Sequence, residues 1–64
     1  MKTIKIEKTK FLENREYIEK ENLPKYARMV KDELVVLYYE LEPFEKDRQE
    51  YEKMGYDFKK IEWT

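Results

Sequence analysis

The sequence predicts a small α+β domain in which helices cover one face of a four-stranded antiparallel sheet. Three patterns carry this prediction: an alternating segment near the start, an apolar run over residues 34–39, and helical spacing over residues 43–54. The predicted order is β-α-β-β-α-β, which is the ferredoxin-like arrangement. If the first helix is absent, the alternative is a β-sheet covered by the single helix 43–54.

The first strand is expected over residues 3–7, because Ile4 and Ile6 alternate with polar residues. The first helix is expected over residues 14–21, where Asn14 can cap the helix start. A loop or a strand is the alternative for this segment.

A β-hairpin is expected over residues 26–41, with a three-residue loop at 31–33 and a central strand at 34–39 that is apolar on both faces. A two-residue loop is disfavoured, because it needs positive φ angles that Asp and Glu adopt poorly. The preferred register gives two inward pairs and three outward pairs. The inward pairs are Met29 with Val35 and Ala27 with Leu37, and the outward pairs are Val30 with Leu34, Arg28 with Val36 and Tyr26 with Tyr38.

The second helix is expected over residues 43–54, because Pro43 suits the first helical position and Phe44 begins an apolar stripe. Gly55 can end this helix in the left-handed conformation. A last strand follows over residues 56–63. Its aromatic and apolar residues change parity midway, which predicts a bulge near residues 59–60.

The chain has 64 residues, which is enough for a single domain (residues 1–64) with one small core. It contains no His, Cys or Ser, so disulfides, ordinary zinc sites and Ser-His or Cys-His nucleophile pairs are excluded. We therefore expect a protein that is not an enzyme and needs no cofactor. Its ten aromatic residues (6 Tyr, 3 Phe and 1 Trp) can supply the core, and association into a homodimer is a second route to stability.

Protein recognition is the function that the sequence favours. The predicted outward face of the hairpin carries side chains of the types enriched at binding hot spots, and its candidate residues are Tyr26, Arg28, Val36, Tyr38 and Glu40. The expected partner is another protein or a second copy of the chain. A compact inhibitor of a host enzyme, as phages and mobile elements use, is one form that such a module takes. The alternative is that the two tyrosines merely cover a sheet face and that Arg28 stacks on one of them.

Two other functions stay open at this point. A weak single-strand nucleic-acid binder would use Tyr26, Tyr38 and the basic first half of the chain, although the net charge of −1 argues against it. A metal-dependent enzyme would use Glu40 and Glu42, helped by Asp47, to hold Mg²⁺. No apolar run is long enough to span a bilayer and the start lacks a secretory signal, so a cytoplasmic location is expected.

Overall fold

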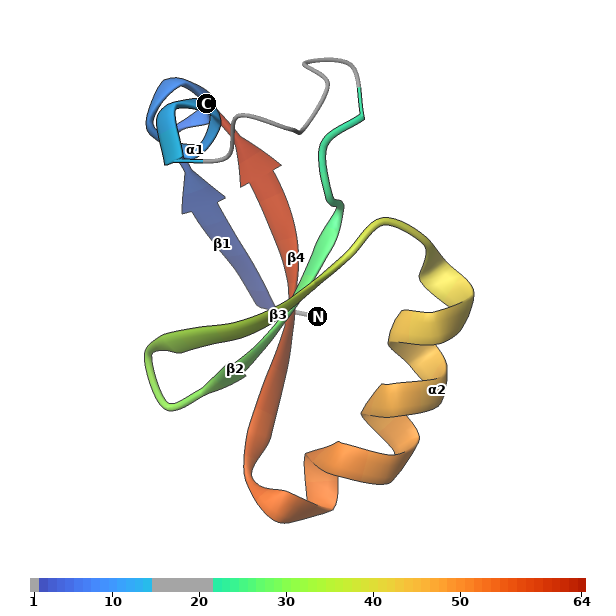
Figure 1. Ribbon diagram of the computed structural model, residues 1–64. Coiled ribbons are helices and arrows are strands. Elements are labelled where there is room, and N and C mark those ends of the chain that lie inside the picture. The colour runs from blue at the N-terminus through green and yellow to red at the C-terminus, as the bar shows by residue number, and fades with distance from the viewer. Residues whose placement is uncertain (1, 15–21) are drawn as a thin grey trace.

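The computed structural model describes residues 2–14 and 22–64 and confirms the α+β class. The described residues form four strands and two α-helices, and Figure 1 shows how they are arranged. The elements follow the predicted order along the chain: β1 (Lys2–Ile6), α1 (Lys8–Asn14), β2 (Tyr26–Val30), β3 (Glu33–Tyr38), α2 (Leu41–Tyr51), the 3-10 turn η1 (Glu52–Met54) and β4 (Tyr56–Trp63).

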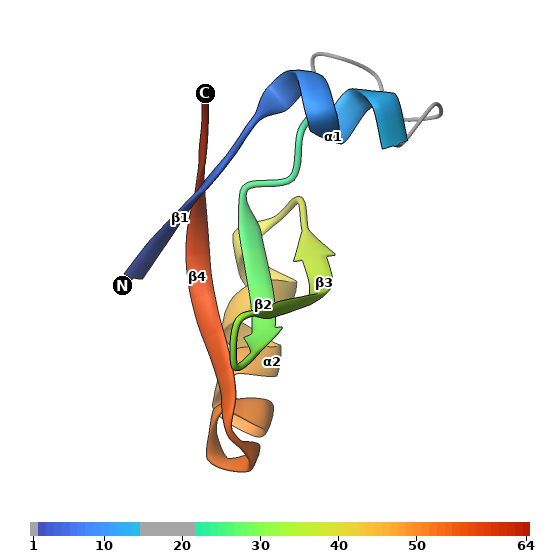
Figure 2. The same ribbon diagram turned by 90° about the vertical axis from the view of Figure 1, so that its left-hand side faces the viewer.

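The order of strands within the sheet is β1-β4-β2-β3, so the ferredoxin-like sheet is not confirmed. Figure 2 shows β1 and β3 at the two edges. The expectation of a fully antiparallel sheet was wrong, because β1 pairs with β4 in parallel while β2 is antiparallel to both β3 and β4. In β1, Lys5 is exposed opposite Glu62, and an edge strand tolerates this charge more easily than a central strand does.

The core on one face of the sheet lies beneath α2. Phe44 is fully buried there, and its ring lies 4.5 Å from the ring of Tyr26, 5.7 Å from Tyr38 and 5.5 Å from Phe58. We call these four residues the aromatic cluster. Because each large ring buries extensive apolar area, the cluster provides much of the stability of so short a chain.

The helix predicted over residues 43–54 is confirmed with shifted bounds. It starts two residues earlier, at Leu41, and its last turn tightens into the 3-10 turn η1. Gly55 follows with φ 95° and ψ 5°, the left-handed conformation predicted for the residue that ends the helix.

The hairpin of β2 and β3 has a two-residue turn at Lys31 and Asp32, so the predicted three-residue loop was wrong. Lys31 has a φ of 57°, which supplies the positive angle that a tight hairpin turn requires. Three of the predicted pairs are present: Tyr26 with Tyr38, Ala27 with Leu37, and Arg28 with Val36.

β3 contains a β-bulge, because this side of the hairpin has one residue more than its pairing with β2 uses. The register shifts between Arg28 and Met29, and Met29 then pairs with Leu34. Val35 is therefore the extra residue of β3. The predicted pairs of Met29 with Val35 and of Val30 with Leu34 were wrong. The turn is one residue shorter than predicted, so the extra residue lies in β3 instead of in the loop.

The opposite face of the sheet carries α1 at one end. Phe11 of α1 lies edge-on to Trp63 with the ring centroids 4.9 Å apart, and the Trp63 indole nitrogen donates a 2.8 Å hydrogen bond to the carbonyl of Pro24. Phe58 and Trp63 are five residues apart on one strand, so their side chains point to opposite faces. The two helices lie on opposite sides of the sheet in Figure 1, rather than on one face as expected.

This arrangement also explains the parity change in β4. The pairing of β4 with β1 and β2 is continuous, so the bulge predicted near residues 59–60 is not present. Phe58 packs under α2, while Ile61 is buried on the other face. Apart from Asn14, which ends α1, the helix predicted over 14–21 lies outside the described residues.

Candidate functional site

Most of the predicted recognition patch is packed under α2. Tyr38 is only 6% exposed, Tyr26 is a partly buried member of the aromatic cluster, and Val36 packs against this cluster. The Tyr38 hydroxyl donates a 2.7 Å hydrogen bond to the Asp47 carboxylate of α2. Burial, followed by this hydrogen bond, raises the pKa of Tyr38 to about 12.

Arg28 is held between two aromatic rings on the same face. The carbon at the centre of its guanidinium group lies 4.4 Å from the ring centroid of Tyr51 and 5.0 Å from that of Tyr56. The stacking partners are therefore neither Tyr26 nor Tyr38. The Nε atom of Arg28 is buried and has no hydrogen-bond partner among the residues that the structure describes, so the contact with the two rings is what compensates for its burial.

The prediction that Tyr26, Arg28 and Tyr38 face outward was therefore wrong. Alternation along a strand sorts residues into two faces but does not say which face a helix will cover. Here α2 covers the face with the tyrosines, and the side chains of Ala27 and Met29 point to the other. Bases cannot stack on Tyr26 and Tyr38 without displacing Phe44, so this face offers no platform for single-stranded nucleic acid.

The three carboxylates considered for Mg²⁺ do not form a common site. Asp47 accepts the hydrogen bond of Tyr38, whereas Glu40 is the exposed N-cap residue of α2 and Glu42 lies in its first turn. Within residues 2–14 and 22–64, no group of three or more acidic, His or Cys side chains is placed to hold a metal ion.

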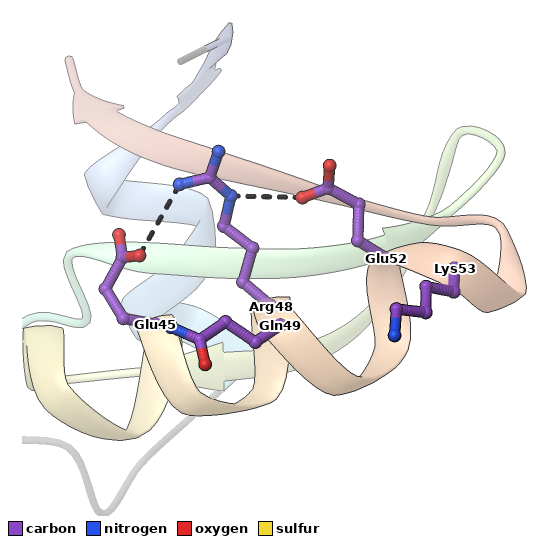
Figure 3. A pocket seen from close by; sticks show the side chains of 5 residues that line it. All are labelled: Glu45, Arg48, Gln49, Glu52 and Lys53. Atoms are coloured by element: carbon purple, nitrogen blue, oxygen red, sulfur yellow. Dashed lines mark hydrogen bonds and ion pairs between the residues drawn. The ribbon is translucent and has the colours of Figure 1, made fainter.

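A shallow charged groove of about 490 Å³ runs along α2. Figure 3 shows Arg48 between two carboxylates, with Nε 3.0 Å from Glu52 and a terminal nitrogen 3.4 Å from Glu45. The hydrogen bond that Arg48 donates to Glu52, together with the charge of Glu45, raises the pKa of Arg48 above its ordinary value. These are ion pairs at helical spacing between half-exposed side chains, so they stabilise the helix slightly and neutralise one another.

The outer edge of β3 has a different character. A hollow of about 340 Å³ lies there, and the described residues that line it all belong to β3 or directly follow it: Leu34, Val35, Val36, Leu37 and Tyr39. We call these five residues the β3 edge. Leu34 is 41% exposed, Val35 46% and Tyr39 36%, so apolar side chains meet solvent along a strand that has one neighbouring strand among the described residues.

Sequence reasoning placed this run in the centre of the sheet, because strands that are apolar on both faces are usually buried on both. The structure corrects that placement: β3 is an end strand. The signal that could have found the site was present, since the four residues from Leu34 to Leu37 include none of the charged or proline residues that usually protect an edge strand.

In the part of the chain that the structure describes, no helix has both the length and the apolar character needed to cross a membrane. No protein-family model matches the chain, and neither a curated protein nor a solved structure is significantly similar to it.

Proposed function

We propose that this chain is a non-enzymatic protein-interaction module that binds its partner through the β3 edge. The observation that carries the proposal is the exposure of Leu34 and Val35 on an end strand. Small proteins usually protect such edges with charge or proline, because unpaired backbone groups beside apolar side chains attract another strand. An edge without this protection supports a binding role.

The mode of binding that fits this surface is strand addition. In this mode the partner's backbone pairs with the free N–H and C=O groups of an edge strand, while alternate side chains fill adjacent hollows. The β3 edge offers both components, since within residues 2–14 and 22–64 no strand pairs with its outer backbone and its side chains line a hollow. The backbone would supply affinity and the apolar side chains would supply selectivity.

Stability of the monomer does not account for these residues. Val35 is the extra residue of a bulge and is 46% exposed, so its burial contributes little to folding. An exposed valine at this position has a clearer role if it becomes buried when a partner binds.

Site-specific photo-cross-linking in the native cell tests the proposal. A photoreactive amino acid at position 35 is expected to give a discrete protein adduct. The matched control places the same group at position 54, because Met54 is an exposed apolar residue (68%) in η1 and is not part of the β3 edge. No adduct from position 35, or the same adducts from both positions, would contradict binding through this edge.

A further inference from the structure

We infer that the occupant of the β3 edge is a second copy of this chain, paired antiparallel through a two-fold axis that passes between Val35 and Val36. This inference rests on the function proposed above and specifies its partner. The two four-stranded sheets would then join into one continuous sheet with the two β3 strands at its centre.

The sequence of β3 suits pairing with itself. Residues 34–37 read Leu-Val-Val-Leu, which is the same in both directions. In the proposed register, Leu34 lies opposite Leu37 of the second copy and Val35 lies opposite its Val36. Every apolar residue of this run therefore meets another apolar residue, as an isologous interface requires.

The bulge makes this register geometrically consistent. In a regular strand, residues three apart point to opposite faces and opposite edges, so Leu34 and Leu37 could not lie opposite each other in a symmetric pair. In β3, however, Leu34 pairs with Met29 and Leu37 pairs with Ala27, and these two residues are only two apart on the regular strand β2. Leu34 and Leu37 consequently share both a face and a backbone orientation.

The next pair of residues away from the proposed axis also matches in face and backbone orientation. Glu33 pairs with Val30 and Tyr38 pairs with Tyr26, and these partners are four apart on β2. Glu33 and Tyr38 thus also match in orientation across the proposed axis. A bulge usually discourages pairing at an edge strand. In β3 the bulge instead lets the residues on its two sides present the same face and the same backbone orientation to a second copy.

The proposed register also brings one pair of opposite charges together at each end of the interface. Continuing the register beyond the strand brings Lys31, at the hairpin turn, opposite Glu40 of the second copy, and the two-fold axis repeats this pair at the other end. Asp32 and Glu33 follow Lys31 in each copy, so this pair offsets part of the acidic charge at each end of the interface. The other sheet edge is a poorer partner, because β1 carries the exposed charges of Lys2 and Lys5. In addition, pairing of β1 in one copy with β3 in the next would leave a free edge at each end and would give an open polymer.

Sedimentation of the purified full chain from micromolar to near-millimolar concentration tests self-association. We expect a reversible monomer–dimer equilibrium that Val35→Lys weakens at least about tenfold, because the two-fold axis would bring the new charges of both copies together within the apolar strip. Met54→Lys is the matched control and should associate as the wild type does. A chain that stays monomeric throughout, or a dimer that Val35→Lys leaves intact, overturns the inference.

A charge-reversal experiment tests the register. Lys31→Glu and Glu40→Lys should each weaken self-association about three- to tenfold, because each variant places like charges at both ends of its own dimer. An equimolar mixture of the two variants should regain the wild-type dissociation constant, because both end pairs then become opposite in sign. Failure of mixing to restore association would overturn this register, whereas circular dichroism of each variant controls for folding.

The photo-cross-linking described above separates this inference from the proposed function. An adduct from position 35 with twice the mass of the 8.1 kDa chain supports both. An adduct with a different protein, combined with a monomeric purified chain, overturns the second copy as occupant and leaves binding through the β3 edge standing. The absence of any adduct from position 35 removes both.

Discussion

Two neighbouring regions of β3 carry large apolar side chains that differ strongly in exposed fraction. Tyr38, at the end of the strand, is 6% exposed and belongs to the aromatic cluster, whereas Val35, three residues earlier, is 46% exposed at the outer edge. The first region holds the monomer together, and the second is available to a partner. Apolar character alone therefore does not distinguish a residue that stabilises the fold from one that binds.

The largest expected effect is that of Phe44→Ala, which removes the ring of α2 that packs against Tyr38 in the buried region. Phe44 is fully buried among three aromatic rings, so its truncation should lower the free energy of unfolding by about 3 to 5 kcal/mol and leave so small a domain largely unfolded. Urea titration followed by circular dichroism measures the effect. Leu41→Ala on the same helix, at a side chain 51% exposed, is the control and should cost less than about 0.5 kcal/mol.

The next effect concerns alkaline pH. Because the folded state raises the pKa of Tyr38 from 10.0 to about 12, it holds the phenol proton more tightly than the unfolded chain does. The resulting stabilisation is complete below pH 10 and is lost as the pH rises to about 12, a loss on the order of 2 to 3 kcal/mol.

Urea titrations across this pH range measure that loss against Tyr38→Phe. The variant should be less stable near neutral pH by about 1 kcal/mol, since the hydrogen bond to Asp47 is removed, and should lose less stability between pH 10 and 12. Tyr39→Phe, at the neighbouring exposed position, serves as the control. Parallel pH profiles for all three proteins would show that the Tyr38 proton is not linked to folding.

A smaller effect of opposite sign is expected at the hairpin turn. Lys31 has a φ of 57°, a conformation that is strained for lysine and free for glycine, so Lys31→Gly should raise the free energy of unfolding of the monomer by about 0.5 to 1 kcal/mol. The same substitution removes the charge proposed to meet Glu40 of a second copy, and should weaken self-association. Thermal unfolding measures the stability of the monomer and sedimentation measures self-association. A gain in the first with a loss in the second would show that Lys31 contributes to association at the expense of stability. A loss of stability would show that the lysine is not strained there.

The local elements of the fold were largely predictable from the sequence. Alternation identified β1, helical spacing and Gly55 identified α2 with its end, and the register of Tyr26, Ala27 and Arg28 with β3 was correct. These features depend on residues that are close in the chain or joined by one tight turn, so their patterns are contained in short segments.

The order of the strands and the choice of the covered face were not predictable in the same way. They depend on which of two similar faces α2 packs against, and both faces of the hairpin carry apolar side chains. Tyr26 and Tyr38 have rings that suit a core and hydroxyls that suit a surface, so either orientation satisfies the local pattern. The candidate site was consequently assigned to the buried face, and the exposed edge was mistaken for a central strand.

The smallest expected effect is the stability change from Val35→Lys at concentrations where the chain is monomeric. Because Val35 is nearly half exposed and is the extra residue of a bulge, the free energy of unfolding should change by less than about 0.5 kcal/mol. Ala27→Lys on the adjacent strand is the informative comparison: Ala27 is fully buried, and a lysine there should unfold the protein. Urea titration of both variants would distinguish an open edge from a packed one. If Val35→Lys destabilised the monomer as strongly as Ala27→Lys, the valine would belong to the core, and its exposure could no longer support a binding role.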